Sequence, residues 1–432
     1  MSAVADALEG EALSSWIERF HDMVERNAPE LERVAARTKV AITVTRALDC
    51  LVHEIQQRQS LDCDAMAKFL TSCKVLMRDR RGIECLLTPE TLELFLLLAG
   101  RAAPSKQDWV ANEEAIKCTI NSIYSRPEFV AEHCVPKSFQ QRLLVQAKRA
   151  GPASFHLLVW KTLLVAFTSG LTCAVLSIQT LAFTIQDTEL VTFPHGKDRI
   201  DLALELLKLL AVMANAMKWT KEDEQAKPTI YQEIYLVGGL LLEILQLGMC
   251  DSAASPITDV RNKALEIFMV LPAALPRAFV TRYVQQGEAP PSITDAASGN
   301  SPSMDRIMAS LVNHLHAMLV RVRVEKTRPM SDMVPAVVTC FNLSSSGDDF
   351  KTYFKQQIFP DDTKATNAPD ALASPPQFLC KHLLFFLTCL DTDVRRCVGE
   401  WLYLLCDKNA DEYTRRTGIG NAVGMLRIKG LA

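Results

Sequence analysis

The chain has 432 residues, of which 49% are hydrophobic and 22% charged, and its formal net charge is −3. This composition is typical of a folded globular protein, and so small a net charge excludes a strongly basic nucleic-acid-binding protein. The 13 cysteines include no C-x-x-C pair and no Cys/His cluster at zinc spacing, which excludes the common structural zinc sites.

The cysteines also indicate a compartment. Most of them fall within apolar helical runs, where a free thiol packs as a small hydrophobe, and this favours a reducing, intracellular environment. The first residues show no secretory signal. The longest apolar runs, such as FHLLVWKTLLVAF, are interrupted by His156 and Lys161 and are too short for a membrane span.

Apolar residues recur at helical spacing along the chain, and no stretch shows the alternation typical of a strand. The sequence therefore predicts an all-α fold. The predicted helices occupy residues 11–26, 30–57, 61–77, 88–99, 109–125, 138–149, 154–168, 199–218, 229–248, 258–271, 303–324, 331–343, 376–390 and 393–407. Two polar stretches, 285–303 and 360–376, are predicted to be mobile loops inserted into one array of helices.

The stretch 388–406, TCLDTDVRRCVGEWLYLLC, shows how neighbouring helices are expected to join. The apolar spacing of one helix ends at Leu390 and that of the next begins at Val394. Asp391 between them is a typical helix N-cap, because its carboxylate accepts hydrogen bonds from free backbone N–H groups. The stretch predicts two antiparallel helices joined by a turn of two or three residues.

Two segments, 115–139 and 336–360, share a layout that suggests repeats. Each contains an apolar helix ending in an asparagine (Asn121 or Asn342), then a polar break, then a short helix opened by phenylalanine and followed by proline. An armadillo repeat has this layout, with the asparagine of its third helix on the concave face. The sequence predicts one right-handed superhelical solenoid of armadillo/HEAT-like repeats over residues 1–432.

Basic and amide side chains recur at similar places in successive predicted hairpins. Lys74 and Arg78 are four residues apart, as are Lys117 and Asn121, so each pair shares one face of a helix. Lys161 falls within a later helix. Each residue alone is typical of a solvated surface charge, and together they suggest a polar ladder lining a groove for an extended or helical peptide.

Motifs of covalent catalysis are absent from the sequence: there is no G-x-x-x-x-G-K-[ST], G-x-S-x-G, H-E-x-x-H or G-x-G-x-x-G. His314 and His316 are two residues apart and so lie on different helix faces, which suits a metal poorly. The glycines of RTGIGNAVGML (416–426) follow a helix, and we expect them to cap and bend the chain rather than bind phosphate. No enzyme, cofactor or metal site is predicted.

The C-terminal quarter resembles the synembryn family, also called the resistance-to-inhibitors-of-cholinesterase family. DTDVRRCVGEWLYLLC and YTRRTGIGNAVGMLRIKGLA are similar to the end of its armadillo-like core, with an L-D-T-D-V-[KR]-R helix start and a T-G-[YI]-G-N-A-x-G-[LM]-L segment. The matching residues are Asp391, Thr392, Asp393, Val394, Arg396, Thr417, Gly418, Gly420, Asn421, Ala422, Gly424 and Leu426. Thinner matches include VLMRDR (75–80), AIKCTINSIYS (115–125) and YFKQQIFP (353–360).

This resemblance implies a cytoplasmic, monomeric guanine-nucleotide exchange factor and folding chaperone for heterotrimeric G-protein α subunits. It implies that the α subunit, GDP-bound or nucleotide-free, places its C-terminal helix in the concave groove. The contacts implied by matching position are Lys74, Arg78, Asn121, Phe155, Lys161 and Lys355. Lys74 stands where the family can have arginine, and a lysine cannot bind a carboxylate with two parallel hydrogen bonds.

The resemblance further implies that the family's regulatory C-terminal tail is absent from this chain, and that the protein can be recruited to the cell cortex or plasma membrane. No nucleic acid, cofactor or integral membrane segment is implied. An alternative stays open: a passive armadillo-type scaffold could bind a helical or acidic peptide without promoting nucleotide exchange. The C-terminal motif favours the exchange factor.

Overall fold

A computed structural model describes residues 13–26, 37–42, 44–45, 48, 63–79, 81–103, 105–128, 130, 137–170, 181, 184–185, 197–216, 228–247, 256–271, 274–286, 304–360 and 376–431. Every regular element within these residues is a helix, which confirms the predicted all-α fold. The chain divides into two compact units, unit 1 (Met1–Ser177) and unit 2 (Ile178–Ala432), and each is considered by itself.

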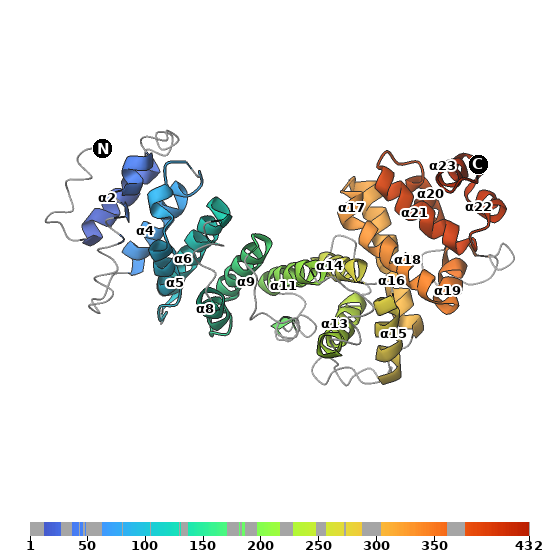
Figure 1. The fold of residues 1–432 in the computed structure, drawn as a ribbon, viewed down its shortest axis with the longest axis horizontal. Coiled ribbons are helices and arrows are strands. Elements are labelled where there is room, and N and C mark those ends of the chain that lie inside the picture. The colour runs from blue at the N-terminus through green and yellow to red at the C-terminus, as the bar shows by residue number, and fades with distance from the viewer. Residues whose placement is uncertain are drawn as a thin grey trace. The chain divides into compact units, whose positions relative to one another are not determined.

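Unit 1 contains α2 (Leu13–Arg26), α4 (Cys63–Leu76), the 3-10 turn η2 (Glu84–Leu86), α5 (Pro89–Ala99), α6 (Lys106–Ser125), α8 (Lys137–Ala147) and α9 (Ala153–Thr168). Four of these helices form a series in which each packs against the next, in the order α2, α4, α6, α9 (Figure 1). α5 packs against α6, and α8 packs against α9. The predicted contacts of unit 1 therefore lie on, or just after, the neighbouring helices α4, α6 and α9.

Aromatic packing and helix caps hold unit 1 together. Trp16 of α2 stacks on Phe20 at 5.1 Å between ring centroids, and Phe69 of α4 lies 6.4 Å and 6.0 Å from these two rings. α6 begins with a capping box, because the Ser105 hydroxyl accepts from Asp108 N while the Asp108 carboxylate accepts from Ser105 N. The cap fixes where α6 starts.

Unit 2 contains α11 (Lys197–Ala216), α13 (Pro228–Gln246), α14 (Pro256–Val270), α15 (Ala274–Gln286), α16 (Met304–Glu325), α17 (Pro329–Asp332), α18 (Val334–Ser346), α19 (Asp348–Ile358), α20 (Pro376–Phe386), α21 (Thr392–Leu405), α22 (Ala410–Thr417) and α23 (Ile419–Ile428). A second packed series runs α11, α14, α18, α21 (Figure 1). The remaining helices flank it.

The C-terminal part of unit 2 is fastened by a buried tryptophan. The Trp401 indole Nε1 donates a 3.1 Å hydrogen bond to the Ser344 hydroxyl, which joins α21 to α18. Phe354 of α19 meets the Trp401 ring edge to face at 5.5 Å. Because a buried indole N–H without a partner would be costly, this bond fixes how α21 sits on α18.

The two series have the successive helix contacts expected of stacked repeats. One continuous armadillo/HEAT-like solenoid through residues 1–432 stays a prediction, because the structure describes each unit by itself. The polar stretches 285–303 and 360–376 lie outside the described residues except at their ends, as does most of the predicted helix 30–57.

Three helices of unit 2 were not predicted from the sequence: α15, α22 and α23. The prediction for Leu390 was also wrong, since its side chain is 99% exposed. The N–H groups of residues 387–389 bond three residues back instead of four, so α20 tightens and ends, and Leu390 leaves the apolar stripe. The connection to α21 is therefore longer than the predicted turn.

Free cysteines pack in the core, as the sequence predicts. Cys73, Cys118 and Cys340 are buried free thiols, and burial raises the pKa of each. Among the described residues, no group of three or more His, Cys, Asp or Glu side chains is placed to hold a metal ion.

No described helix taken singly is long and apolar enough to cross a membrane, although one bent pair, Pro256–Val270 with Leu275–Val284, meets the criterion of length and composition.

Candidate functional site

The first predicted contact, Lys74, is held by a carboxylate of the neighbouring helix. Its ammonium pairs with Glu114 Oε2, and Lys117 Nζ pairs with Glu114 Oε1 at 2.7 Å. Burial raises the pKa of Glu114, but hydrogen bonds from Lys117 and Lys74 outweigh burial and hold this pKa below its usual range. The charge of Lys74 is thus partly neutralised within the protein.

Asn121 lies on α6 one helical turn beyond Lys117. Its side-chain amide Nδ2 donates to the main-chain carbonyl of Lys74, with 3.5 Å between the two atoms. The structure therefore brings Lys74 and Asn121 together at the contact between α4 and α6. This bond ties the end of α4 to the same face of α6 that carries Lys117.

Arg78 is the most available cation of this group. It lies just after the end of α4, its side chain is exposed, and its guanidinium makes no ion pair with any residue that the structure describes. The adjacent carboxylate is not free to neutralise it, because Asp79 pairs with Arg37 at 3.1 Å and with Arg81 at 3.2 Å. Among the described residues, the positive charge of Arg78 is therefore not compensated by an ion pair.

Two predicted contacts lie on α9, and they differ in exposure. Lys161 is exposed, and within the described part of unit 1 no ion pair engages its ammonium. Phe155 is 0% exposed and meets Trp109 of α6 at 5.0 Å, so its ring cannot touch a partner in this conformation. Phe155 instead anchors the start of α9 against α6.

Lys355 belongs to unit 2, and the other five predicted contacts belong to unit 1. Its ammonium pairs with Asp407 Oδ2 at 2.6 Å, and Lys351 pairs with Asp407 Oδ1 at 3.1 Å. The hydrogen bond from Lys355 is the main reason that the pKa of Asp407 lies below its usual range. Lys355 thus links α19 to the turn after α21.

The C-terminal motif forms two helix starts. Asp391 caps α21 as predicted, accepting from the backbone N–H groups of Asp393 at 3.0 Å and Val394 at 3.2 Å. Gly418 joins α22 to α23 with φ +85°, a left-handed conformation that favours glycine. The prediction that the glycines cap and bend the chain is confirmed for Gly418 but wrong for Gly420 and Gly424, which lie within α23.

Comparison with known proteins decides the family. The model of a family described as guanine nucleotide exchange factor synembryn matches residues 69–432. The chain belongs to the synembryn family. It is similar to proteins named Chaperone Ric-8A from Macaca fascicularis (22% identical over 409 residues, covering 89% of this chain and 72% of the relative), Xenopus laevis (23% over 239 residues, 55% and 40%) and Rattus norvegicus (22% over 397 residues, 86% and 70%).

Membership of the synembryn family confirms the resemblance predicted from the C-terminal motif. The matched range contains all six predicted contacts. Sequence reasoning missed Glu114, although its position three residues before Lys117 on one helix was a visible signal. It also missed Asp407, which no spacing in the sequence connects with Lys355.

Proposed function

We propose that this chain, as a synembryn family member, is a guanine-nucleotide exchange factor and folding chaperone for heterotrimeric G-protein α subunits. The observation that carries this proposal is the family match over residues 69–432. In the proposed complex, the C-terminal helix of the α subunit lies on the face of unit 1 that carries Lys74, Arg78, Asn121 and Lys161.

Charge supports the choice of this face. Arg78 and Lys161 are exposed cations without ion pairs among the described residues, so a partner's carboxylates can bind them without displacing an internal partner. Lys74 must share its charge with Glu114, and Lys355 with Asp407, so these two lysines contribute less. Phe155 acts only through the position of α9.

The mechanism needs no covalent chemistry. If the groove binds the α subunit's C-terminal helix best in the position that it has in the nucleotide-free state, binding of the chain must weaken nucleotide binding by the same free energy. Moving a population from 1:99 to 99:1 takes a differential of about 5.5 kcal/mol. The same preference stabilises the nucleotide-free α subunit until GTP binds, which is the chaperone function.

Release of labelled GDP from a purified α subunit tests the proposal. The chain is added as wild type, as Arg78→Ala with Asn121→Ala, and as Arg142→Ala. The last variant is the matched control, because Arg142 is an exposed arginine of unit 1 that already pairs with Glu93. We expect wild type and the control to accelerate release, and the double variant to lose most of the acceleration.

The affinities for the two forms of the α subunit distinguish a passive scaffold from an exchange factor. A scaffold binds the GDP-bound and nucleotide-free α subunits equally well, whereas the proposed exchange factor binds the nucleotide-free form more tightly. Equal affinities, with no acceleration of GDP release, would contradict the proposal. A monomeric protein of the cytoplasm, recruited to the membrane by its partner, fits this function.

A further inference from the structure

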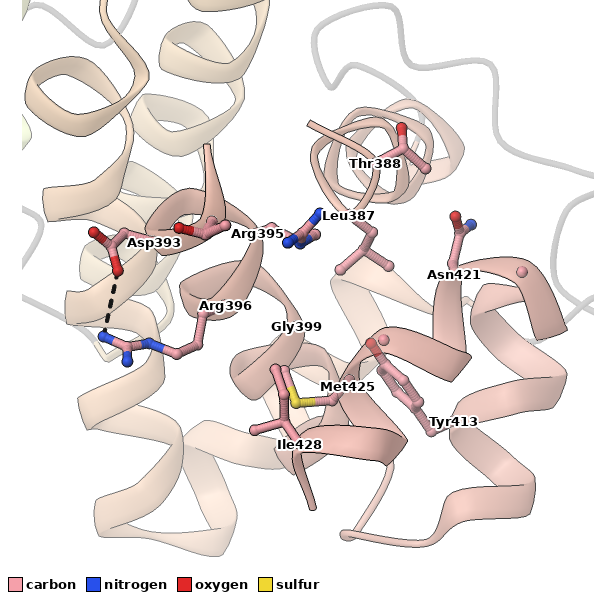
Figure 2. A pocket seen from close by; sticks show the side chains of 13 residues that line it. Leu387, Thr388, Asp393, Arg395, Arg396, Gly399, Tyr413, Asn421, Met425 and Ile428 are labelled. Atoms are coloured by element: carbon pink, nitrogen blue, oxygen red, sulfur yellow. Dashed lines mark ion pairs between the residues drawn. The ribbon is translucent and has the colours of Figure 1, made fainter. Parts of the chain in front are cut away.

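A second surface lies at the C-terminal end of unit 2, where α21, α22 and α23 enclose a pocket of about 550 Å³. Figure 2 shows this pocket with the side chains that line it. Its walls include Arg395 and Arg396 of α21, Tyr413 of α22, and Gly420, Gly424 and Ile428 of α23. None of these residues takes part in the proposed binding of the α subunit's C-terminal helix.

Glycines shape the pocket. A Cβ atom on Gly399 of α21 would come within 2.5 Å of Met425 Cε, so this glycine lets α21 and α23 touch at the floor. Farther out, Gly420 and Gly424 stand one helical turn apart on α23, and a Cβ atom on either would meet nothing within 4 Å. The two helices therefore touch near Gly399 and leave open space beside Gly420 and Gly424 of α23.

A buried hydroxyl without a partner points into this groove. Tyr413 is 0% exposed, and its hydroxyl forms no hydrogen bond with any described residue. Figure 2 shows the hydroxyl directed toward the space between Leu387 and Met425. Burial raises the pKa of Tyr413, so the phenol keeps its proton and can both donate and accept. An unmade buried hydrogen bond costs about 1–3 kcal/mol, so the pocket lacks a polar group that a ligand can supply.

Positive charge lies at the rim. Arg395 is exposed and pairs with no carboxylate in the described part of the chain, while Arg396 pairs with Asp393 at 3.6 Å. One acidic and two basic side chains therefore line the groove, which favours an anionic partner.

Exposed apolar side chains lie on α23 to either side of Gly420 and Gly424. Ile428, which lines the pocket, is 65% exposed, and Ile419 and Val423 on the other side are 75% and 39% exposed. Exposed apolar side chains next to polar ones are typical of an interaction surface. Because both walls are helices and the glycines let another backbone approach closely, a helix fits this groove better than an extended strand.

We propose that the groove between α21 and α23 docks an amphipathic α-helix of a partner protein. The helix inserts an apolar side chain beside Gly420 and Gly424, and its carboxylates bind Arg395 and Arg396. A polar group of the same helix, or a water that it traps, pairs with the Tyr413 hydroxyl. This contact is additional to the α-subunit site of unit 1 and does not depend on it.

The test uses the full chain and a display library of 16-residue helical peptides with randomised apolar and charged positions. Retained peptides are measured by fluorescence polarisation against wild type, Gly424→Leu and Gly239→Leu. Gly239 is the matched control, because it also lies within a helix of unit 2 and a Cβ there also meets nothing within 4 Å. Leucine favours a helix more than glycine does, so we expect both variants to fold, and circular dichroism checks this.

We expect selected peptides to carry apolar residues four apart together with Glu or Asp. Gly424→Leu should weaken their binding at least about tenfold by filling the groove, and Gly239→Leu should leave it unchanged. Arg395→Glu should weaken binding by a similar factor, and Tyr413→Phe by about three- to tenfold without loss of stability.

Peptides that bind Gly424→Leu as tightly as wild type, or a selection that yields no acidic peptides, would overturn the proposal. Sedimentation of the full chain gives a second check. Dimers of wild type that Gly424→Leu converts to monomers would show that a second copy fills the groove, which also overturns the proposal.

Discussion

The carboxylate of Glu114 holds the ammonium of Lys74 across the contact between α6 and α4. The first cation of the proposed binding face is therefore bound to its own chain before a partner arrives. Any acidic group of a partner must compete with Glu114 for Lys74, whereas no described carboxylate pairs with Arg78. Lys74 and Arg78, four residues apart in the sequence, thus differ in how available their positive charge is to a partner.

Removing this competition should strengthen partner binding. Glu114→Gln keeps the size of the side chain but releases Lys74 and Lys117, so we expect about threefold tighter binding of the α subunit's C-terminal peptide. Folding stability should fall by about 1 kcal/mol, since two ion pairs are lost. Glu93→Gln is the matched control, because Glu93 pairs with Arg142 in the same unit. Weaker binding by Glu114→Gln would mean that Glu114 positions Lys74 for the partner.

Glu243 should make unit 2 lose stability as pH rises. The residue is 6% exposed on α13, and burial raises its pKa from 4.5 to about 8. Between these values the folded chain binds a proton that the unfolded chain has lost. The contribution of Glu243 to the free energy of unfolding is therefore fully present below about pH 4.5. Between about pH 4.5 and about pH 8 it falls by about 1.4 kcal/mol per pH unit.

Urea unfolding at pH 6 and pH 8 measures this effect. Glu243→Gln cannot ionise, so its stability should exceed that of wild type at pH 8, and the difference should shrink at pH 6. Subtracting the unfolding free energy of Glu243→Gln from that of wild type at each pH removes the contributions of other titrating groups. An identical loss of stability in both proteins would rule out Glu243 as its source.

Gly418 and Gly420 should respond oppositely to the same substitution. Gly418 has φ +85° and ψ 146°, a region almost confined to glycine, so Gly418→Ala should destabilise unit 2 by about 1–3 kcal/mol. Gly420 is helical with open space around its Cβ position, so Gly420→Ala should stabilise by about 0.5–1 kcal/mol. Thermal melts of the two variants decide this. Equal shifts would show that the turn tolerates a side chain.

Phe155 should matter for stability and not for contact with the partner. Phe155→Ala removes a fully buried ring and should cost unit 1 about 3–5 kcal/mol. In conditions where the variant is still folded, its affinity for the α subunit's C-terminal peptide should match that of wild type. A folded variant with much weaker binding would show that Phe155 does contribute to the contact with the partner. Circular dichroism and peptide titration on the same samples provide both readouts.

The sequence predicted the helical class and the cap at Asp391, because these depend on local patterns. The apolar spacing after Val394 and the cap at Asp391 needed only neighbouring residues. Leu390 was misplaced because a helix end depends on a tightened final turn, which apolar spacing does not reveal. The short helices α22 and α23 were missed because glycines at 418, 420 and 424 look like a loop in sequence.

The binding face was predicted only in part, because pairing between helices is not visible in a sequence. The spacing of Lys74 and Arg78 located both cations, but it could not show that Glu114 engages one and not the other. Likewise, the helical stripe that contains Phe155 could not show which apolar residues of α9 face α6. Contacts between distant residues, such as Lys355 with Asp407, required the folded structure.

The buried thiols can be used to follow the unfolding of each unit. Cys73 and Cys118 lie in the core of unit 1 and Cys340 in that of unit 2, and their raised pKa values keep them as unreactive thiols while the fold is intact. A pulse of alkylating reagent during denaturation would therefore mark each unit at the moment its core opens. Mass spectrometry of the labelled peptides would then show whether the units open together or one after the other, and whether a bound α subunit protects one of them.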